Sequence, residues 1–140
     1  MNIDEKLKEI ATGEAFAEFS YVFENWYDAD RAIEHLQLPA IISVLPFSGG
    51  IERRNGRVSD QQNFAIAFVD KVQRNALGED NAAVYNRMKQ RGVDFLNAID
   101  ASGYFEALPQ YVPYHVICER LSSIVTGIMF DLTLKEQKHC

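Results

Sequence analysis

The chain is poor in cysteine and has no long apolar run. Its 140 residues include only two cysteines, Cys118 and Cys140, which do not make a disulfide framework. No apolar stretch approaches the ~18 residues that a membrane-spanning helix requires. The opening residues 1–5 (MNIDE) are acidic, whereas a signal peptide starts with basic residues. We therefore expect no membrane association and a cytoplasmic location.

Positive charge is also in short supply. Fourteen Lys and Arg residues stand against twenty Asp and Glu residues, which gives a net charge of −6. A molecule of this charge repels polyanions, so we expect no direct binding to nucleic acid. The hydrophobic fraction of 47% and the charged fraction of 24% are those of an ordinary globular protein. With this length they indicate one domain spanning residues 1–140.

The usual catalytic motifs are missing. There is no Gly-x-Ser-x-Gly elbow and no His-Glu-x-x-His helix. Ser48, Gly49 and Gly50 lack the Gly-Lys-Ser/Thr ending and the following helix of a phosphate-binding loop, so they predict a turn. We therefore expect a protein that is not an enzyme and has no cofactor.

Two groups of side chains invite a metal hypothesis. His115 and Cys118 lie three residues apart in a predicted strand, so they point to opposite faces and do not share an ion without a bulge between them. Asp28 and Asp30, with Glu24 nearby, have oxygen ligands for a divalent cation. Capping of a helix that starts at Asp28 explains these carboxylates more simply. We expect no metal site.

The clearest strand lies near the end of the chain. Alternate residues from Ile124 to Leu134 form an almost wholly apolar face, while the other face changes from apolar at Val125 to charged at Asp131 and Lys135. Such a strand lies on a core and runs out to water. Residues 111–120 predict a preceding strand, and we place this hairpin at the centre of a sheet.

Other elements follow from local patterns. A helix is predicted over about 80–101, with Gly103 just past its end and Gly92 in its apolar stripe, where close packing is expected. Residues 46–60 predict a long, polar, exposed hairpin loop with an Asn55-Gly56 turn. The remaining elements are a first helix capped by Asn2, strands over 19–23, 40–45 and 64–69, and a short helix over 28–36.

This order of elements predicts the fold class. Consecutive strands joined by turns favour antiparallel pairing. We therefore expect an α+β domain with a four- to five-stranded, mainly antiparallel sheet and its two main helices packed on one face.

Arg53, Arg54 and Arg57 place three guanidinium groups on the predicted loop of an otherwise acidic protein. Guanidinium groups suit carboxylates and phosphates, so the loop is a candidate for docking on an acidic protein partner or for contact with nucleic acid, and we favour the protein partner. The alternative is a solvated loop tip with Glu52 and Asp60 as counter-charges.

Aromatic residues gather just before and within the strand predicted over 111–120. They are Tyr104, Phe105, Tyr111 and Tyr114, close to two prolines. Large rigid rings in irregular chain suit a subunit interface, and they equally suit a core. Both interpretations stay open, and Tyr111 and Tyr114 join the three arginines as candidate interface residues.

Three stretches of the chain together carry a family resemblance. The first is residues 38–50 (LPAIISVLPFSGG), leading through the loop to 63–71 (NFAIAFVDK). The second is the helix with Met88, Lys89 and Phe95, ending in 101–106 (ASGYFE), and the third is 124–134 (IVTGIMFDLTL). These stretches resemble the tail-terminator group of tail-completion proteins from tailed bacteriophages and prophages, and the third looks like the last strand of such proteins.

The resemblance implies a non-enzymatic structural protein of α+β fold that forms a ring, typically a hexamer. In that family the ring caps the finished tail tube and offers a surface to the head connector. Copies of itself, the tail tube and head-connector proteins would then be its partners. It would reside in the bacterial cytoplasm during assembly and in the virion tail of a functional phage. The family has no chemical motif to transfer to particular residues.

Two other classes remain as alternatives. One is a bacterial adaptor module that binds a protein partner through the 46–60 loop and its arginines. The other is a small enzyme or ligand-binding protein with a pocket between helix and sheet. His35, His115 and the acidic residues near Asp28 are its candidate site residues.

Overall fold

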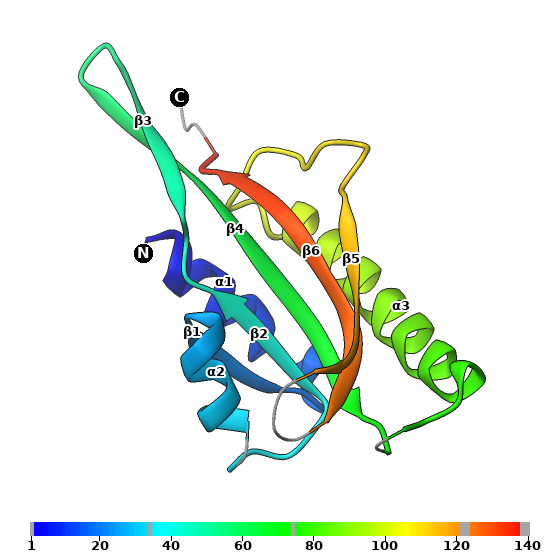
Figure 1. Cartoon of the computed structure of the whole chain (residues 1–140). Coiled ribbons are helices and arrows are strands. Elements are labelled where there is room, and N and C mark those ends of the chain that lie inside the picture. Colours follow the sequence, from blue (N-terminus) through cyan, green and yellow to red (C-terminus); the bar gives the residue numbers. More distant parts are fainter. Residues whose placement is uncertain (1, 34, 74, 121–123, 138–140) are drawn as a thin grey trace.

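The computed structural model describes residues 2–33, 35–73, 75–120 and 124–137, which form an α+β fold (Figure 1). None of the helices in these residues is both long and apolar enough to cross a membrane. The elements in chain order are α1 (Ile3–Ala11), the short 3₁₀ turn η1 (Glu14–Phe16), β1 (Ser20–Glu24), α2 (Trp26–Ile33), β2 (Ala40–Val44), β3 (Ser48–Arg54), β4 (Arg57–Lys71), α3 (Gly78–Ser102), β5 (Tyr114–Arg120) and β6 (Val125–Lys135).

The described strands form one six-stranded, largely antiparallel sheet in the order β1-β2-β4-β6-β5, with β3 also paired to β4. The 15-residue strand β4 is its spine. On one side β4 pairs first with β3 and then with β2, and on the other side it pairs with β6 from Gln61 to Lys71. Only β1 and β2 run parallel, joined by α2.

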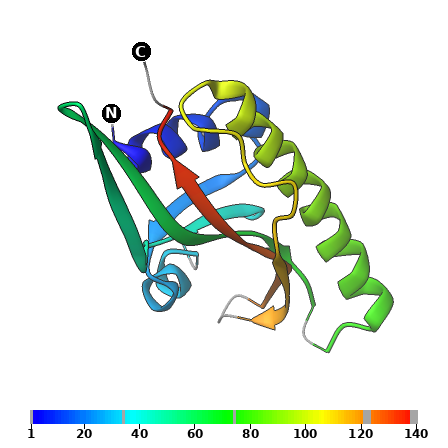
Figure 2. The ribbon, with the colours of Figure 1, turned by 90° about the horizontal axis from the view of Figure 1, so that it is seen from above.

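The helices lie on both faces of the sheet. Figures 1 and 2 show α1 and α3 on one face and α2 on the other. The larger core lies under α1 and α3, where Phe68 of β4 meets Phe95 of α3 edge-on, with ring centroids 5.4 Å apart. A smaller core under α2 contains Ala29, Ile42 and Ala67. The prediction that the two main helices share one face is confirmed.

Close packing explains the glycine in the middle of α3. A Cβ atom on Gly92 would lie 2.3 Å from Cε2 of Phe130, so only glycine lets β6 come this close to the helix. At the end of α3, Gly103 has a left-handed φ of 75°, as expected of a helix stop. Both expectations for this helix are confirmed.

The predicted C-terminal strand is confirmed as β6. Ile128, Phe130 and Leu134 are buried against α1 and α3, while the opposite face changes from buried Val125 to exposed Asp131. The position of the hairpin was wrong in part, because β5 forms an edge of the sheet and only β6 lies inside it.

Three further predictions need correction. The sheet has six described strands instead of four or five, because the predicted loop at 46–60 is mostly an ordered hairpin in which β3 includes Gly49 and Gly50. These residues have no apolar alternation, so their strand follows from pairing with β4. The short helix begins at Trp26 instead of Asp28, because the side chain of Asn25 accepts the Asp28 N–H at 2.8 Å and caps it.

Candidate functional site

A two-stranded arm projects from the sheet. The pairing of β4 with β6 ends at Gln61 and Lys135, so residues 50–60 continue as β3 and β4 alone, and we call them the arm (Figure 1). Its turn is Asn55-Gly56, with φ of 49° and 77°. Positive φ at both central residues is typical of the two-residue turn that suits twisted strands, so the predicted Asn-Gly turn is confirmed.

The pairing register separates the three arginines. Arg54 lies opposite Arg57, while Arg53 lies opposite Val58 and therefore on the other face of the arm. Glu52 bonds Arg54 at 3.3 Å and Lys135 at 2.9 Å, and its hydrogen bond to Lys135 raises the pKa of that lysine. Glu52 is thus the expected counter-charge, whereas Asp60 contacts Gln62 instead.

One face of the arm carries two exposed apolar side chains together with Arg53 and with Asp60, which lies opposite Ile51. Ile51 is 61% exposed and Val58 is 67% exposed, and the register places them diagonally on the same face with Arg53. Among the described residues, no hydrogen bond or ion pair reaches Arg53. We call Ile51, Arg53 and Val58 the arm patch.

Polar contacts brace the base of the arm. Lys6 of α1 bonds Glu136 at 2.8 Å, and Glu136 also accepts the backbone N–H of Asp60 at 3.1 Å. The Lys6 hydrogen bond lowers the pKa of Glu136. Burial, followed by the nearby Asp60 carboxylate, raises the pKa of Asp4. The arm is therefore attached to both α1 and the end of β6.

A second exposed region lies where the chain passes from α3 to β5. Residues 106–113, which we call the strap, run beside β6 and bond it at two points. Glu106 donates its N–H to the Lys135 carbonyl at 2.8 Å, and Asp131 donates to the Pro113 carbonyl at 3.1 Å. Between these points the strap leaves β6 and opens a groove beside Thr133.

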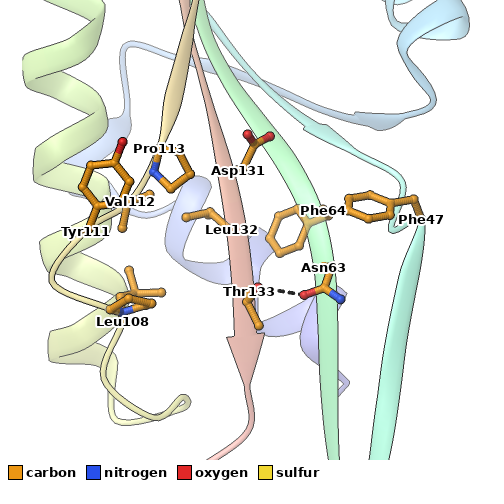
Figure 3. Close-up of a pocket in the computed structure, with 11 residues that line it drawn as sticks. Phe47, Asn63, Phe64, Leu108, Tyr111, Val112, Pro113, Asp131, Leu132 and Thr133 are labelled. Atoms are coloured by element: carbon orange, nitrogen blue, oxygen red, sulfur yellow. Dashed lines mark hydrogen bonds between the residues drawn. The ribbon is translucent and has the colours of Figure 1, made fainter.

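This front groove has a volume of about 390 Å³ and opens on the sheet face opposite α1 and α3 (Figure 3). Its lining is mostly apolar, and at its floor Thr133 donates a hydrogen bond to the side-chain oxygen of Asn63 at 2.7 Å. Exposed aromatic rings stand at its two ends, Phe47 at 79% and Tyr111 at 81% exposure. The remaining lining residues are Phe64, Leu108, Pro109, Val112, Pro113, Asp131 and Leu132.

Asp131 is the one charged residue that lines the front groove. Its carboxylate lies 3.0 Å from Nε2 of His115 and its side chain is half exposed. A second hollow of about 480 Å³ lies on the other side of the strap, against α3. There Tyr114 packs on Phe130 with centroids 6.2 Å apart, and the Lys89 ammonium lies 5.3 Å from the Tyr114 ring.

The predicted interface residues therefore form two separate regions. The arginines lie on the arm, beside β4, and the tyrosines lie on the strap and β5, beyond β6. Tyr111 is exposed and Tyr114 is partly packed. Two interpretations were left open for these rings, a subunit interface and a core, and the exposure of Tyr111 fits the interface better. Phe47, Ile51, Val58 and Asp131 were not among the site residues predicted from the sequence. Apolar residues within a polar, glycine-rich stretch were the available signal for the first three.

The candidate metal and catalytic residues do not converge in the described part of the chain. No group of three or more His, Cys, Asp or Glu residues there is arranged to hold a metal ion. Asp28 bonds Asn25 at 2.7 Å and Arg31 at 3.1 Å, as a residue in the first turn of a helix. Neither hollow beside the strap is lined by His35, His115 or Asp28.

Comparison with protein-family models and with curated proteins found no match to this chain. Its functional interpretation therefore depends on its own residues and on the geometry described above.

Proposed function

We propose that this chain is a structural, non-enzymatic protein of bacteriophage or prophage tail assembly that associates with copies of itself into a ring. The ring caps the tail tube and joins it to the head connector. The observation that supports this most is the presence of two unlike exposed surfaces, the projecting arm and the front groove, in different parts of the sheet.

Unlike surfaces are what a ring requires. A two-fold dimer uses the same patch on both subunits, whereas a ring joins one patch to a different patch on the next copy. The arm patch lies on a hairpin that projects from the sheet and carries two exposed apolar side chains (Figure 1). The front groove is concave and has exposed aromatic rings at its ends. Surfaces of these shapes complement each other.

The resemblance to tail terminators adds support. Its first stretch forms β2, the start of β3 and the second half of β4, and its last stretch nearly coincides with β6. These are the strands that carry the arm and the groove floor. In this proposal the protein acts in the bacterial cytoplasm during assembly, ends in the virion tail of a functional phage, and typically forms a hexamer.

Light scattering on a sizing column over a wide range of protein concentration tests the proposal. A single discrete mass at a multiple of 15.9 kDa, near six times that value for a hexamer, is expected. Tail tubes added to the protein should acquire it at one end, as seen by electron microscopy. A monomer at every concentration that also leaves the tubes bare would contradict the proposal.

A bacterial adaptor module is the second candidate. It is favoured by the projection of the arm and by the position of Arg54 directly opposite Arg57 on one face of the arm. Glutamate in place of Arg53, Arg54 and Arg57 should then abolish binding of a purified protein partner while circular dichroism shows an unchanged fold. Unchanged binding by this variant would reject the role of the arm in an adaptor.

A further inference from the structure

The arm patch combines apolar surface with a charge that lacks an internal counter-charge. Ile51 and Val58 are mostly exposed, and Arg53 shares their face. Within the described residues Arg53 has no ion pair, in contrast to Arg54, which bonds Glu52 at 3.3 Å. An arginine set between aliphatic side chains suits a partner surface that offers both a carboxylate and aromatic rings.

The front groove offers these groups. Asp131, whose half-exposed carboxylate also contacts Nε2 of His115 at 3.0 Å, provides its one carboxylate, and Phe47 and Tyr111 provide rings at its two ends (Figure 3). The polar groups of the floor already satisfy each other, because Thr133 bonds Asn63 at 2.7 Å. When an apolar side chain covers this floor, the Thr133 hydroxyl therefore keeps its hydrogen bond to Asn63.

The arm patch of one chain does not reach the front groove of that same chain. The patch shares its sheet face with Phe64 and Phe68, which pack under α1 and α3, whereas Asn63, Asp131 and Thr133 lie on the opposite face. Arg53 also lies five residues beyond Ser48, about 16 Å along an extended strand. A contact between these two surfaces therefore joins different copies.

We propose that the arm patch of one copy binds the front groove of the next copy, with Arg53 pairing with Asp131. Ile51 and Val58 then cover the aromatic rings of the groove, and the Arg53 guanidinium is placed to stack on Tyr111. This contact rests on the proposed function, since it is the join between neighbouring subunits of the ring. The arm carries three arginines against Glu52 and Asp60, a net charge of +1 in a chain of net charge −6, so the arm and the rest of the molecule attract each other.

Charge reversal on each side tests the pairing. Arg53→Glu places two carboxylates together where the arm patch meets the front groove, and Asp131→Arg places two guanidinium groups there. Each variant alone should therefore associate at least about tenfold more weakly than the wild type. An equimolar mixture should restore assembly. The reversed arm of the first variant meets the reversed groove of the second, and the native arm of the second meets the native groove of the first.

Two controls sharpen the result. Arg54→Glu makes the same change of charge on the opposite face of the arm, so it has the same effect on the overall attraction and should weaken association much less than Arg53→Glu does. The double variant Arg53→Glu/Asp131→Arg should assemble as the wild type does, whether the ring has an even or an odd number of subunits. Circular dichroism and urea unfolding verify that each variant is folded.

The outcomes separate this inference from the proposed function. Association of the wild type, loss in each single variant and recovery in the mixture support the pairing. Association of the wild type with no loss in the single variants, or with no recovery in the mixture, overturns the pairing and leaves the ring proposal standing. A wild type that stays a monomer in light scattering at every concentration overturns the pairing together with self-association in solution.

Discussion

Removal of the apolar side chains of the arm patch should weaken self-association without unfolding the protein. Ile51 and Val58 are 61% and 67% exposed, so an interface that covers them gains most of their burial free energy. Full burial of such a side chain contributes about 1.5–3 kcal/mol. The exposed share of the two side chains together therefore contributes about 2–4 kcal/mol, which corresponds to a roughly 30- to 900-fold change in the dissociation constant.

The variant Ile51→Ser/Val58→Ser tests this magnitude. Sedimentation velocity over a range of concentrations gives its dissociation constant, and urea unfolding gives its stability, which should fall by about 1 kcal/mol or less per substitution. Leu77→Ser is the matched control, because Leu77 is 72% exposed and lies on neither surface. Equal association of the arm variant and the wild type would refute the role of the arm patch, and an equal loss in the control would point to a general effect of surface apolarity.

Three further predictions concern stability. Leu77→Ser should raise the free energy of unfolding by about 1 kcal/mol, because position 77 is the N-cap of α3 and has no side-chain cap; an unchanged urea midpoint would contradict this. Gly127→Ala should lower the free energy of unfolding by about 3 kcal/mol, because the added Cβ would lie 1.9 Å from the Phe68 carbonyl oxygen. Gly50→Ala should change it by less than about 0.5 kcal/mol, because its Cβ meets nothing within 4 Å. Similar urea midpoints for the two variants would refute this packing. Glu136→Gln should be less stable than the wild type at pH 7, because the lowered pKa of Glu136 makes its ionised form stabilising above the unfolded-state pKa. That difference should shrink as the pH falls through the folded-state pKa, and a difference in urea unfolding that stays the same as the pH is lowered would contradict the ion pair with Lys6.

Elements with strong local patterns could be predicted from the sequence. The strand β6 has apolar residues on every second position, and α3 has an apolar stripe followed by Gly103, so their extents were correct within a few residues. The Asn55-Gly56 turn was also correct, because its geometry depends on two adjacent residues. These features depend on interactions between residues close in the chain.

Features that depend on distant pairing could not be predicted in this way. The strand β3 contains two glycines and mostly polar residues, and it forms because β4 lies beside it. Once this strand forms, its alternation places Arg53 and Arg54 on different faces, and the register of the pairing places Arg57 opposite Arg54 and Val58 opposite Arg53. The separation of the arm from the strap follows from the order of β4, β6 and β5, which no local pattern encodes.

Association of copies through two unlike surfaces has a direct test. One variant, Ile51→Ser/Val58→Ser, has a weakened arm patch, and a second variant, Tyr111→Ser, has a weakened front groove. Neither variant should form a ring on its own. The first variant retains an intact groove and the second retains an intact arm. Mixed at equal concentration in a sedimentation experiment, the two variants should form a discrete complex of twice 15.9 kDa. A mixture that remains as monomeric as its components, while the wild type associates, would contradict association through the arm and the groove.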